Sequence, residues 1–409
     1  SLDIDPQSDV APYALYSIAT IESDRSPAKA IETFRRLMQT FPESDLNAEA
    51  LYRIGKLQEK TGEYEKAVST YQKVMADFPA SDFAGRAMLG IGSVYYEREE
   101  YQRAREQFQR VAEKYSDADL AHRASMRAAE TLSARGRYEE AADAYLVIAG
   151  RTDGPWAASA NYWAGVNQQQ AGKNSAAIST LQSFVTENPD DRRVPHAYLR
   201  LGDLHLAQND YEAAKQAYGK ARETAQKASA KLSAQFGELW TQWRKQQSPA
   251  ALDSLTSLLV DNPDSDIVRN NALHVADLHL SRQNPGAALK LARLIIEHHP
   301  DHADVVRALV TCGQAHTMAG DQSAARDTYQ RIIQKYADEP AADVARVHLA
   351  QLEIESGDLQ RAADLLDAIS EEGPAADSLP RLYYGLAEAY FSAEEWGSAK
   401  EAYRQAYRL

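Results

Sequence analysis

The 409-residue chain carries 45 lysine and arginine residues against 59 aspartate and glutamate residues, which gives a net charge of −14. A negative net charge argues against nucleic acid as a general partner, because phosphate binding needs a basic surface. Cys312 is the only cysteine, so neither an intramolecular disulfide nor a cysteine-based zinc cluster can form. No run of 18 apolar residues is present, and we therefore expect no membrane-spanning helix.

Small residues at regular intervals divide the chain into eleven repeats. They recur every 35 to 39 residues, at Ala19, Gly55, Gly92, Ala129, Gly165, Gly202, Gly237, Ala276, Gly313, Ala350 and Ala387. A fixed period in this range is typical of stacked-repeat proteins, in which each unit contacts only its neighbours. We therefore expect a long binding surface in place of a single active-site pocket.

The second copy shows how a repeat is built. Apolar or small residues recur at helical spacing from Leu51 to Gln58, and they do so again from Tyr64 to Val74. The break between the two segments contains Gly62, which suits a helix C-terminus. Each repeat is therefore predicted to be helix A, a tight turn, helix B and a second turn. The second turns are expected near residues 43, 80, 117, 190, 264, 301 and 375.

Three positions of the repeat carry a family resemblance. In most copies an alanine follows the small residue by twelve positions, and a large ring or leucine follows four positions later, as in Gly92, Ala104 and Phe108. Small residues on both helices let the backbones approach closely, and the bulky residue fills the space beside them. The pattern resembles the tetratricopeptide repeat. This resemblance implies an all-α, right-handed superhelical solenoid of about eleven helix-turn-helix repeats with a period near 37 residues.

The turn after helix B carries a second resemblance. It makes the repeat about three residues longer than the usual tetratricopeptide unit, and in the second copy it reads Phe78-Pro79-Ala80-Ser81. Such turns resemble those of bacterial cell-envelope repeat proteins, such as the Tol-Pal coordinator and outer-membrane assembly lipoproteins. This resemblance implies a periplasmic or outer-membrane-associated location, with the cytoplasm as the alternative.

Two copies depart from the common spacing. Ala30 follows Ala19 by eleven residues, and Ala251 follows Gly237 by fourteen. The segment 219–247 also lacks the proline that ends helix B elsewhere, so it is predicted to form a longer or bent helical segment. The alternative is a tolerated, degenerate turn. We expect this joint to divide one continuous solenoid into an arm of repeats 1–6 (1–225) and an arm of repeats 7–11 (226–409).

A basic track along helix A of copies two to six is the candidate binding site. In proteins that resemble tetratricopeptide arrays, helix A lines a concave groove that receives an extended peptide. The predicted groove residues are Arg53, Lys56, Arg86, Arg123, Arg127, Tyr162, Trp163 and Arg200. Arginines bind carboxylates with two hydrogen bonds, and aromatic rings supply rigid contact area. The alternative is that these are ordinary solvated charges beside a packed tryptophan.

Catalytic and metal-binding patterns are not found in the sequence. It contains no glycine-rich phosphate loop, His-Glu-x-x-His helix, Cys-x-x-Cys pair or nucleophile elbow. The histidine-rich segment 297–302 has ligand-like residues, but it occupies the position of an ordinary turn between repeats. Cys312 precedes Gly313 at a packing position and is predicted to be a small buried residue. We expect no catalytic residue, no metal and no cofactor.

The last repeat ends in a helix B whose apolar face has no following helix in the sequence. Tyr403, Ala406 and Tyr407 lie on this face, and solenoids usually cover such a face with a polar capping helix. We interpret the chain either as part of a longer protein or as one that docks a partner through this end. The predicted function is a non-catalytic scaffold that binds protein or peptide segments, some of them acidic, in a bacterial envelope complex. The alternative is a substrate-docking or regulatory arm of a larger enzyme.

Overall fold

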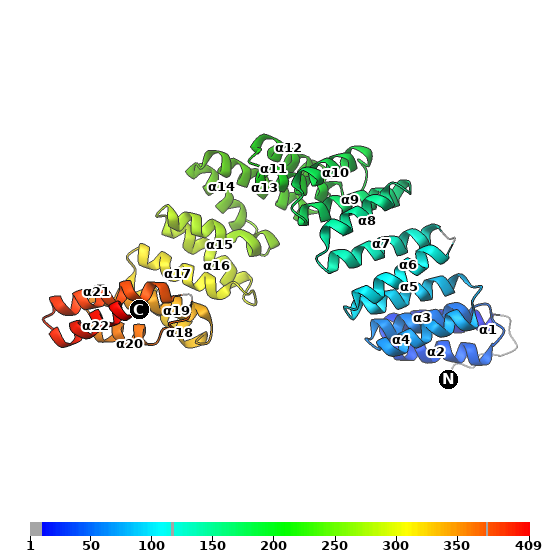
Figure 1. The fold of residues 1–409 in the computed structure, drawn as a ribbon, viewed down its shortest axis with the longest axis horizontal. Helices are drawn as coiled ribbons and strands as arrows, with labels where there is room; N and C mark the ends of the chain where they lie inside the picture. The colour runs from blue at the N-terminus through cyan, green and yellow to red at the C-terminus, as the bar shows by residue number, and fades with distance from the viewer. Residues whose placement is uncertain (1–9, 116–117, 374) are drawn as a thin grey trace. The chain divides into compact units, whose positions relative to one another are not determined.

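The described part of the chain is entirely helical. The computed structural model describes residues 10–115, 118–373 and 375–409, which form 22 α-helices and one short 3-10 helix and contain no strand (Figure 1). The predicted eleven helix pairs are confirmed: odd-numbered helices correspond to helix A and even-numbered helices to helix B. The predicted turns fall between helix B and the next helix A, except that the turn near residue 117 lies outside the described residues.

Contacts within the chain define two compact units, Ser1–Leu204 and His205–Leu409, and their boundary falls inside α11. The division into two arms at residue 225 stays a prediction. Unit 1 holds α1 (Ala11–Arg25), α2 (Pro27–Thr40), α3 (Asn47–Lys60), α4 (Tyr64–Asp77), α5 (Asp82–Glu97), α6 (Tyr101–Lys114), α7 (Ala118–Ala134), α8 (Tyr138–Ala149), α9 (Gly154–Gln170), α10 (Asn174–Glu187) and most of α11 (Val194–Ala207).

Unit 2 continues the same alternation of A and B helices. It holds α12 (Tyr211–Thr224), α13 (Ala228–Gln246), α14 (Pro249–Val260), α15 (Asp266–Ser281), α16 (Pro285–His298), α17 (Val305–Met318), α18 (Gln322–Lys335), α19 (Pro340–Ser356), α20 (Leu359–Asp367), α21 (Leu379–Ser392) and α22 (Trp396–Arg408), with the 3-10 helix Ala376–Ser378 before α21. None of the described helices is long and apolar enough to cross a membrane.

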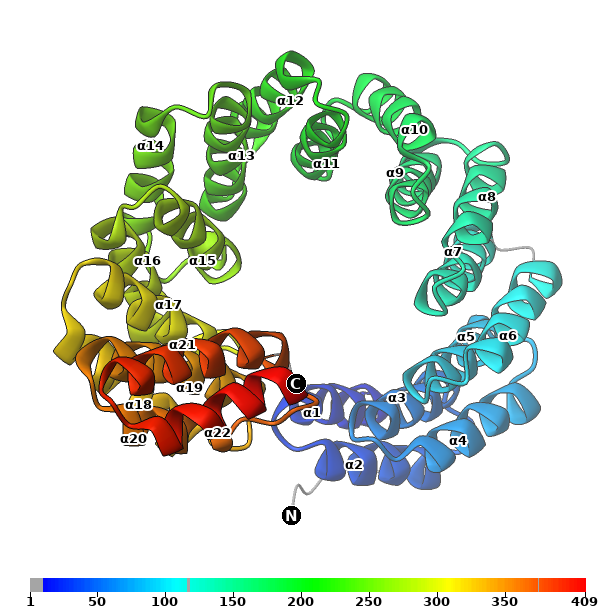
Figure 2. The same ribbon diagram turned by 60° about the vertical axis from the view of Figure 1, so that its left-hand side comes forward.

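The helices of unit 1 form two layers. α3 contacts α5, α5 contacts α7 and α7 contacts α9, and each A helix from α1 to α9 also packs on the B helix of its own repeat. Figure 2 shows the odd-numbered helices of this unit on one side and the even-numbered helices on the other. Successive A helices therefore present one continuous face.

A single ring fills the space between successive A helices. A methyl group on Gly55 of α3 would lie 2.6 Å from the ring of Tyr71, and one on Gly90 of α5 would lie 2.7 Å from the same ring. Tyr71 is accordingly fully buried. In the next repeat a methyl group on Gly92 would lie 2.6 Å from the buried ring of Phe108. The predicted pairing of a small residue with a bulky one is confirmed in these repeats.

The turn between helices A and B contains a left-handed residue in every described repeat after the first. These residues are Gly62, Glu99, Gly136, Gly172, Asn209, Gln247, Gln283, Gly320, Gly357 and Glu394. In the first repeat only Ser26 separates α1 from α2, and its φ is −153°. A turn without the left-handed residue explains why Ala30 follows Ala19 one residue early.

The seventh repeat has the predicted longer helix. α13 has 19 residues, more than any other described helix. It is not continuous with α12, because Ala225 adopts an extended conformation after Thr224. A methyl group on Gly237 would meet the ring of Tyr218 from the preceding repeat instead of a residue of its own helix B. Gly90 makes the same contact with the Tyr71 ring of the repeat before it. Gly237 therefore holds the position two residues before the small residue, which accounts for the longer spacing to Ala251.

Glycine-to-alanine substitutions at Gly92 and Gly219 should have opposite effects on stability. The added methyl group at Gly92 would lie 2.6 Å from the Phe108 ring, whereas nothing lies within 4 Å of one at Gly219. Both changes bring the same gain in helix propensity. The difference between the free energies of unfolding of the two variants therefore reports the steric cost, about 1–3 kcal/mol. We expect Gly92→Ala to be less stable than Gly219→Ala by this amount in urea denaturation followed by circular dichroism. Equal midpoints would show that the ring moves aside without cost.

Substitutions in the tight turn test the left-handed position. Nothing lies within 4 Å of a Cβ at Gly136, whose φ is +72°, so Gly136→Ala carries only the conformational cost of about 1–2 kcal/mol. Glu99 has a φ of +60°, and Glu99→Gly should relieve a similar cost. We expect thermal denaturation to show a lower midpoint for Gly136→Ala and a higher one for Glu99→Gly. A shift of the same sign in both variants would contradict this account.

Candidate functional site

The predicted groove residues all lie on A helices of unit 1. Arg53 and Lys56 lie on α3, Arg86 on α5, and Arg123 and Arg127 on α7. The aromatic pair lies on α9, and Arg200 lies on α11. Because α3, α5, α7 and α9 contact one another in sequence, the basic residues of neighbouring repeats share one surface.

Most of the basic charges are paired with carboxylates of the same helix. Each pair is three or four residues apart: Arg53–Glu49 at 2.8 Å, Lys56–Glu59 at 3.1 Å, Arg123–Asp119 at 3.0 Å and Arg127–Glu130 at 2.6 Å. Exposed pairs of this kind contribute at most about 1 kcal/mol. A ligand carboxylate can therefore compete for these cations, although it must replace an internal partner.

Two of the competing carboxylates are also held by tyrosines. The Tyr16 hydroxyl donates a hydrogen bond to Glu49 at 2.5 Å, and the Tyr71 hydroxyl donates one to Glu59 at 2.6 Å. These bonds fix the carboxylates beside Arg53 and Lys56. Arg53 also lies 5.3 Å from the centre of the Tyr16 ring. Arg53 is thus the more tightly committed of the two cations on α3.

Arg86 differs from the other cations of the track. Its guanidinium lies 5.1 Å from the centre of the Phe83 ring, its side chain is exposed, and within the described residues it forms no ion pair. The Phe83 ring in turn lies 5.5 Å from the ring of Tyr52 on α3. Arg86 therefore offers an uncommitted cation next to a tyrosine of the preceding repeat.

Tyr52 on α3 is a tyrosine whose ionisation three of the predicted cations influence. Burial raises the pKa of Tyr52, and so does the negative charge of Glu59, while the positive charges of Lys56, Arg86 and Arg123 act in the opposite direction. The three cations come from three successive A helices, and each is near enough to influence one hydroxyl. Tyr52 keeps its proton at neutral pH and can donate a hydrogen bond to an anion. The sequence analysis did not single out Tyr52.

The position two residues before the small residue also contributes to packing between repeats. Arg127 lies 4.6 Å from the centre of the Tyr96 ring and 5.4 Å from that of Phe108. In unit 2, His348 has the same position and stacks on Tyr329 with ring centres 5.4 Å apart. This position therefore packs on the bulky residue of the preceding repeat. Arg127 contributes to stacking between repeats as well as to the surface.

The two aromatic residues of α9 lie in different environments. Tyr162 is only 7% exposed and packs against Phe184 at 5.5 Å, with Arg193 5.8 Å from its ring centre. The structure thus places Tyr162 in the core, which corrects the expectation that both rings face a ligand. Trp163 is 41% exposed and lies edge-on to Tyr162. Arg200 donates a hydrogen bond to Gln169 of α9 at 2.9 Å, so it too joins two repeats.

The residues weighed for other chemistry have structural partners. His298 lies 2.7 Å from a carboxylate oxygen of Asp264, and His299 lies 2.9 Å from the carbonyl oxygen of Pro263. Among the described residues no group of three histidine, cysteine, aspartate or glutamate side chains is arranged to hold a metal ion. Cys312 is buried, as predicted, and burial raises its pKa to about 11. Its thiol is therefore not a reactive thiolate at neutral pH.

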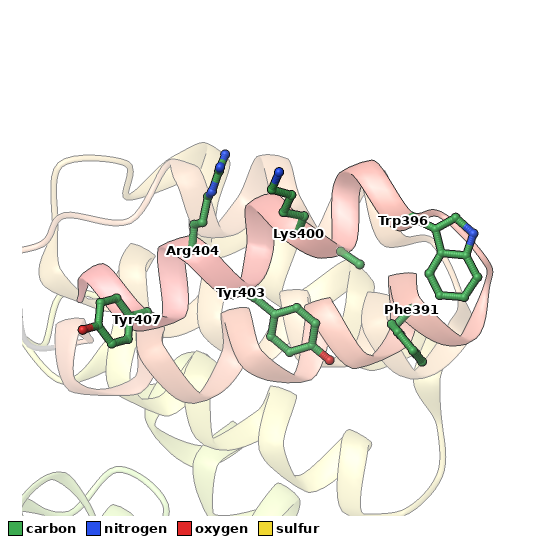
Figure 3. A pocket seen from close by; sticks show the side chains of 7 residues that line it. Phe391, Trp396, Lys400, Tyr403, Arg404 and Tyr407 are labelled. Carbon is green, nitrogen blue, oxygen red and sulfur yellow. The ribbon is translucent and has the colours of Figure 1, made fainter.

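A second surface lies on the last helix pair of unit 2. α21 and α22 form a pocket of about 510 Å³, shown in Figure 3, lined by Phe391, Trp396, Ala399, Lys400, Tyr403, Arg404 and Tyr407. Trp396 is 57% exposed and meets Phe391 edge to face at 4.8 Å. Tyr407 is 95% exposed, which confirms that this aromatic residue is uncovered.

Comparison with known proteins identifies the type of repeat. A family model described as a tetratricopeptide repeat-like domain matches residues 38–165 and 232–409, and a second, described as a tetratricopeptide repeat, matches residues 162–229. No curated protein matches the sequence.

Several solved structures are similar to the chain. A tetratricopeptide repeat protein from Parabacteroides merdae is 14% identical, with 60% of this chain and 93% of that chain covered and a TM-score of 0.41. The structure of Naa15/Naa10 bound to HypK-THB is 12% identical, with 96% and 75% covered and a TM-score of 0.34. Yeast Tom70 is 12% identical, with 98% and 92% covered and a TM-score of 0.36.

The family matches agree with the helix pairs described above. The first family model alone covers well over half of the chain and extends into both units. The second fills the interval between its two matched ranges. The chain therefore belongs to the tetratricopeptide repeat family.

Proposed function

We propose that the protein is a non-catalytic scaffold that binds extended peptide segments on the A-helix face of unit 1. The observation that carries this proposal is that Lys56, Arg86 and Arg123 lie on three successive A helices, α3, α5 and α7, which contact one another in sequence. Three cations and a hydroxyl donor form a surface that suits a carboxylate. The preferred ligand is therefore a peptide that carries acidic groups.

The spacing of the helices sets the length of peptide that this surface takes. Packed helices are about 8–10 Å apart, so α3 to α7 span about 16–20 Å. An extended peptide advances about 3.3 Å per residue. A segment of about five or six residues would thus reach from Lys56 to Arg123. Trp163 on α9 lies one helix further and would extend the contact with an exposed ring.

The cellular setting remains part of the proposal. Turns of the Phe78-Pro79 type resemble those of bacterial envelope repeat proteins, and on this ground we place the scaffold in a periplasmic or outer-membrane-associated complex. Fractionation of the source cells provides a direct test. Recovery of the protein only with cytoplasmic markers would contradict this location without affecting peptide binding.

A charge-matched pair of double variants tests the peptide site. Arg86→Ala with Arg123→Ala removes two cations from the A-helix face, and Lys73→Ala with Arg110→Ala removes two exposed cations from α4 and α6. Twelve-residue peptides are first selected from a random display library on the wild-type protein, and their affinities for all three proteins are measured by fluorescence anisotropy. Charge-assisted hydrogen bonds contribute about 1.5–3 kcal/mol each when shielded from water and less when exposed.

We expect the selected peptides to be rich in aspartate and glutamate and the first variant to bind them at least about tenfold more weakly. The second variant should bind them as the wild type does. Selected peptides without an excess of acidic residues, or an equal loss in both variants, would show that recognition does not take place on the A-helix face.

A further inference from the structure

Three aromatic residues lie along one side of α13, an interior A helix of unit 2. Gly237 holds the position two residues before the small residue, so Trp240 has the position that Lys56 has on α3. Phe236 and Trp243 lie one turn before and one turn after Trp240, on the same side of the helix. The two-residue shift in this repeat therefore places a row of rings where unit 1 carries a cation.

The three rings contact one another and a fourth ring from the next A helix. The centre of the Trp240 ring lies 6.0 Å from that of Phe236 and 4.9 Å from that of Trp243. The exposed His274 of α15 lies 5.0 Å from the Trp240 ring, and α15 lies beside α13 (Figure 2). Phe236 and Trp240 are half-buried. These four residues, called the aromatic cluster below, leave part of an apolar ring surface open to solvent.

Charged side chains beside the cluster are bonded within the chain. Asp277 of α15 pairs with Arg307 of α17 at 2.5 Å. The guanidinium of Arg282 lies 5.9 Å from the centre of the Trp243 ring and donates a hydrogen bond to the carbonyl oxygen of Gln247 at 2.9 Å. A charged ligand would have to replace such bonds, whereas an uncharged ligand would leave them intact. The surroundings of the cluster therefore favour an uncharged ligand.

One polar group of the cluster has no hydrogen-bond partner. Trp243 is 8% exposed, and its buried indole N–H has no acceptor in the described part of the chain. Buried indole N–H groups usually have a partner, because a donor that loses water without gaining an acceptor destabilises the folded state. A carbonyl oxygen of a bound segment would supply the acceptor when the side chains over the indole edge move aside.

A proline-rich segment has the properties that the cluster favours. Its polyproline II helix has no internal hydrogen bonds, so its carbonyl oxygens remain available to a donor. An α-helical partner would use most of its carbonyl oxygens internally. Proline rings are uncharged and apolar, and proline-rich segments bind in aromatic-lined grooves because they lose little conformational entropy.

We propose that the aromatic cluster binds an uncharged, proline-rich segment of a partner protein. A proline ring packs on the exposed parts of Phe236 and Trp240, and a backbone carbonyl oxygen of the segment accepts the Trp243 N–H. The ligand differs in charge from the acidic peptide proposed for unit 1. All residues of this second site lie in unit 2, so the proposal does not depend on peptide binding in unit 1.

Peptide selection followed by substitution tests the proposal. Random twelve-residue peptides are selected by display on the chain carrying Arg86→Ala and Arg123→Ala, so that acidic peptides do not dominate. Their affinities are then measured by fluorescence anisotropy after a third substitution. Trp240→Leu removes a ring but keeps an apolar side chain, and Trp243→Phe keeps a ring but removes the N–H. Trp396→Ala, which removes a 57% exposed tryptophan from α22, is the matched control.

We expect the selected peptides to be rich in proline and poor in charged residues. Trp240→Leu should bind them at least about tenfold more weakly and Trp243→Phe about fivefold more weakly, while the control is unchanged. In NMR spectra of the ¹⁵N-labelled protein, the peptide should shift the indole N–H resonance of Trp243 downfield, as a new hydrogen bond does. Its resonance is assigned as the one missing from Trp243→Phe.

His274→Ala provides a second test of the ring surface at an exposed position. It should also weaken binding, and circular dichroism shows whether each variant remains folded. Three results would overturn the proposal. Selected peptides without an excess of proline would show that the site takes another chemical class. Equal affinities for the ring variants and the control would place binding elsewhere, and an unchanged Trp243 resonance would show that the N–H takes no part.

Discussion

The stack depends on a steric constraint: a bulky side chain, such as a tyrosine or phenylalanine ring, must fit between two A helices. The ring of Tyr71 does so because glycines on both neighbouring helices, Gly55 and Gly90, leave no side chain in its path. The ring then excludes water from the junction and fixes the distance between repeats. Since each repeat contacts only its neighbours, the stability of the array is approximately a sum of such junctions. A shift of two residues at one junction, where Gly237 takes the position of Gly90 against the ring of Tyr218, therefore alters the spacing locally without disturbing the repeats on either side.

The same constraint divides the A-helix surface between two tasks. The position two residues before the small residue packs on the ring of the preceding repeat, as Arg127 does on Phe108, so substitution there affects stacking as well as ligand contact. Arg86 and Arg123 lie six residues before the small residues of their repeats, and Lys56 lies one residue after its own. These positions do not pack on the ring of the preceding repeat. They can serve recognition without weakening a junction. Their common influence on the pKa of Tyr52 follows from their positions in the repeat.

The fold was predictable because one period extends through the entire chain, so every repeat supplied the same evidence for helix length, turn and packing. The site was less predictable. Tyr162 and Trp163 are adjacent and equally aromatic, yet the first is buried by Phe184 and the second is exposed. Which ring faces solvent depends on contacts with the following helix, which sequence spacing does not specify. The ion pair between Arg53 and Glu49 is strengthened by Tyr16 from another repeat. The spacing of Arg53 and Glu49 in the sequence predicts their ion pair, but only the folded structure shows that Tyr16 joins it.

The acidity of the whole chain limits how the basic track can act. With a net charge of −14, the protein repels an acidic peptide at long range, so electrostatic steering toward the A-helix face is weak. Salt screens charges beyond about 8 Å under physiological conditions, whereas Arg86 and Lys56 act on a bound carboxylate over shorter distances. The basic residues therefore contribute mainly to how long a bound peptide stays, rather than to how fast it arrives. Internal carboxylates such as Glu59 and Asp119 reinforce this selectivity, because a ligand must offer better geometry than they do. A track of cations that were all unpaired would bind acidic segments with less discrimination.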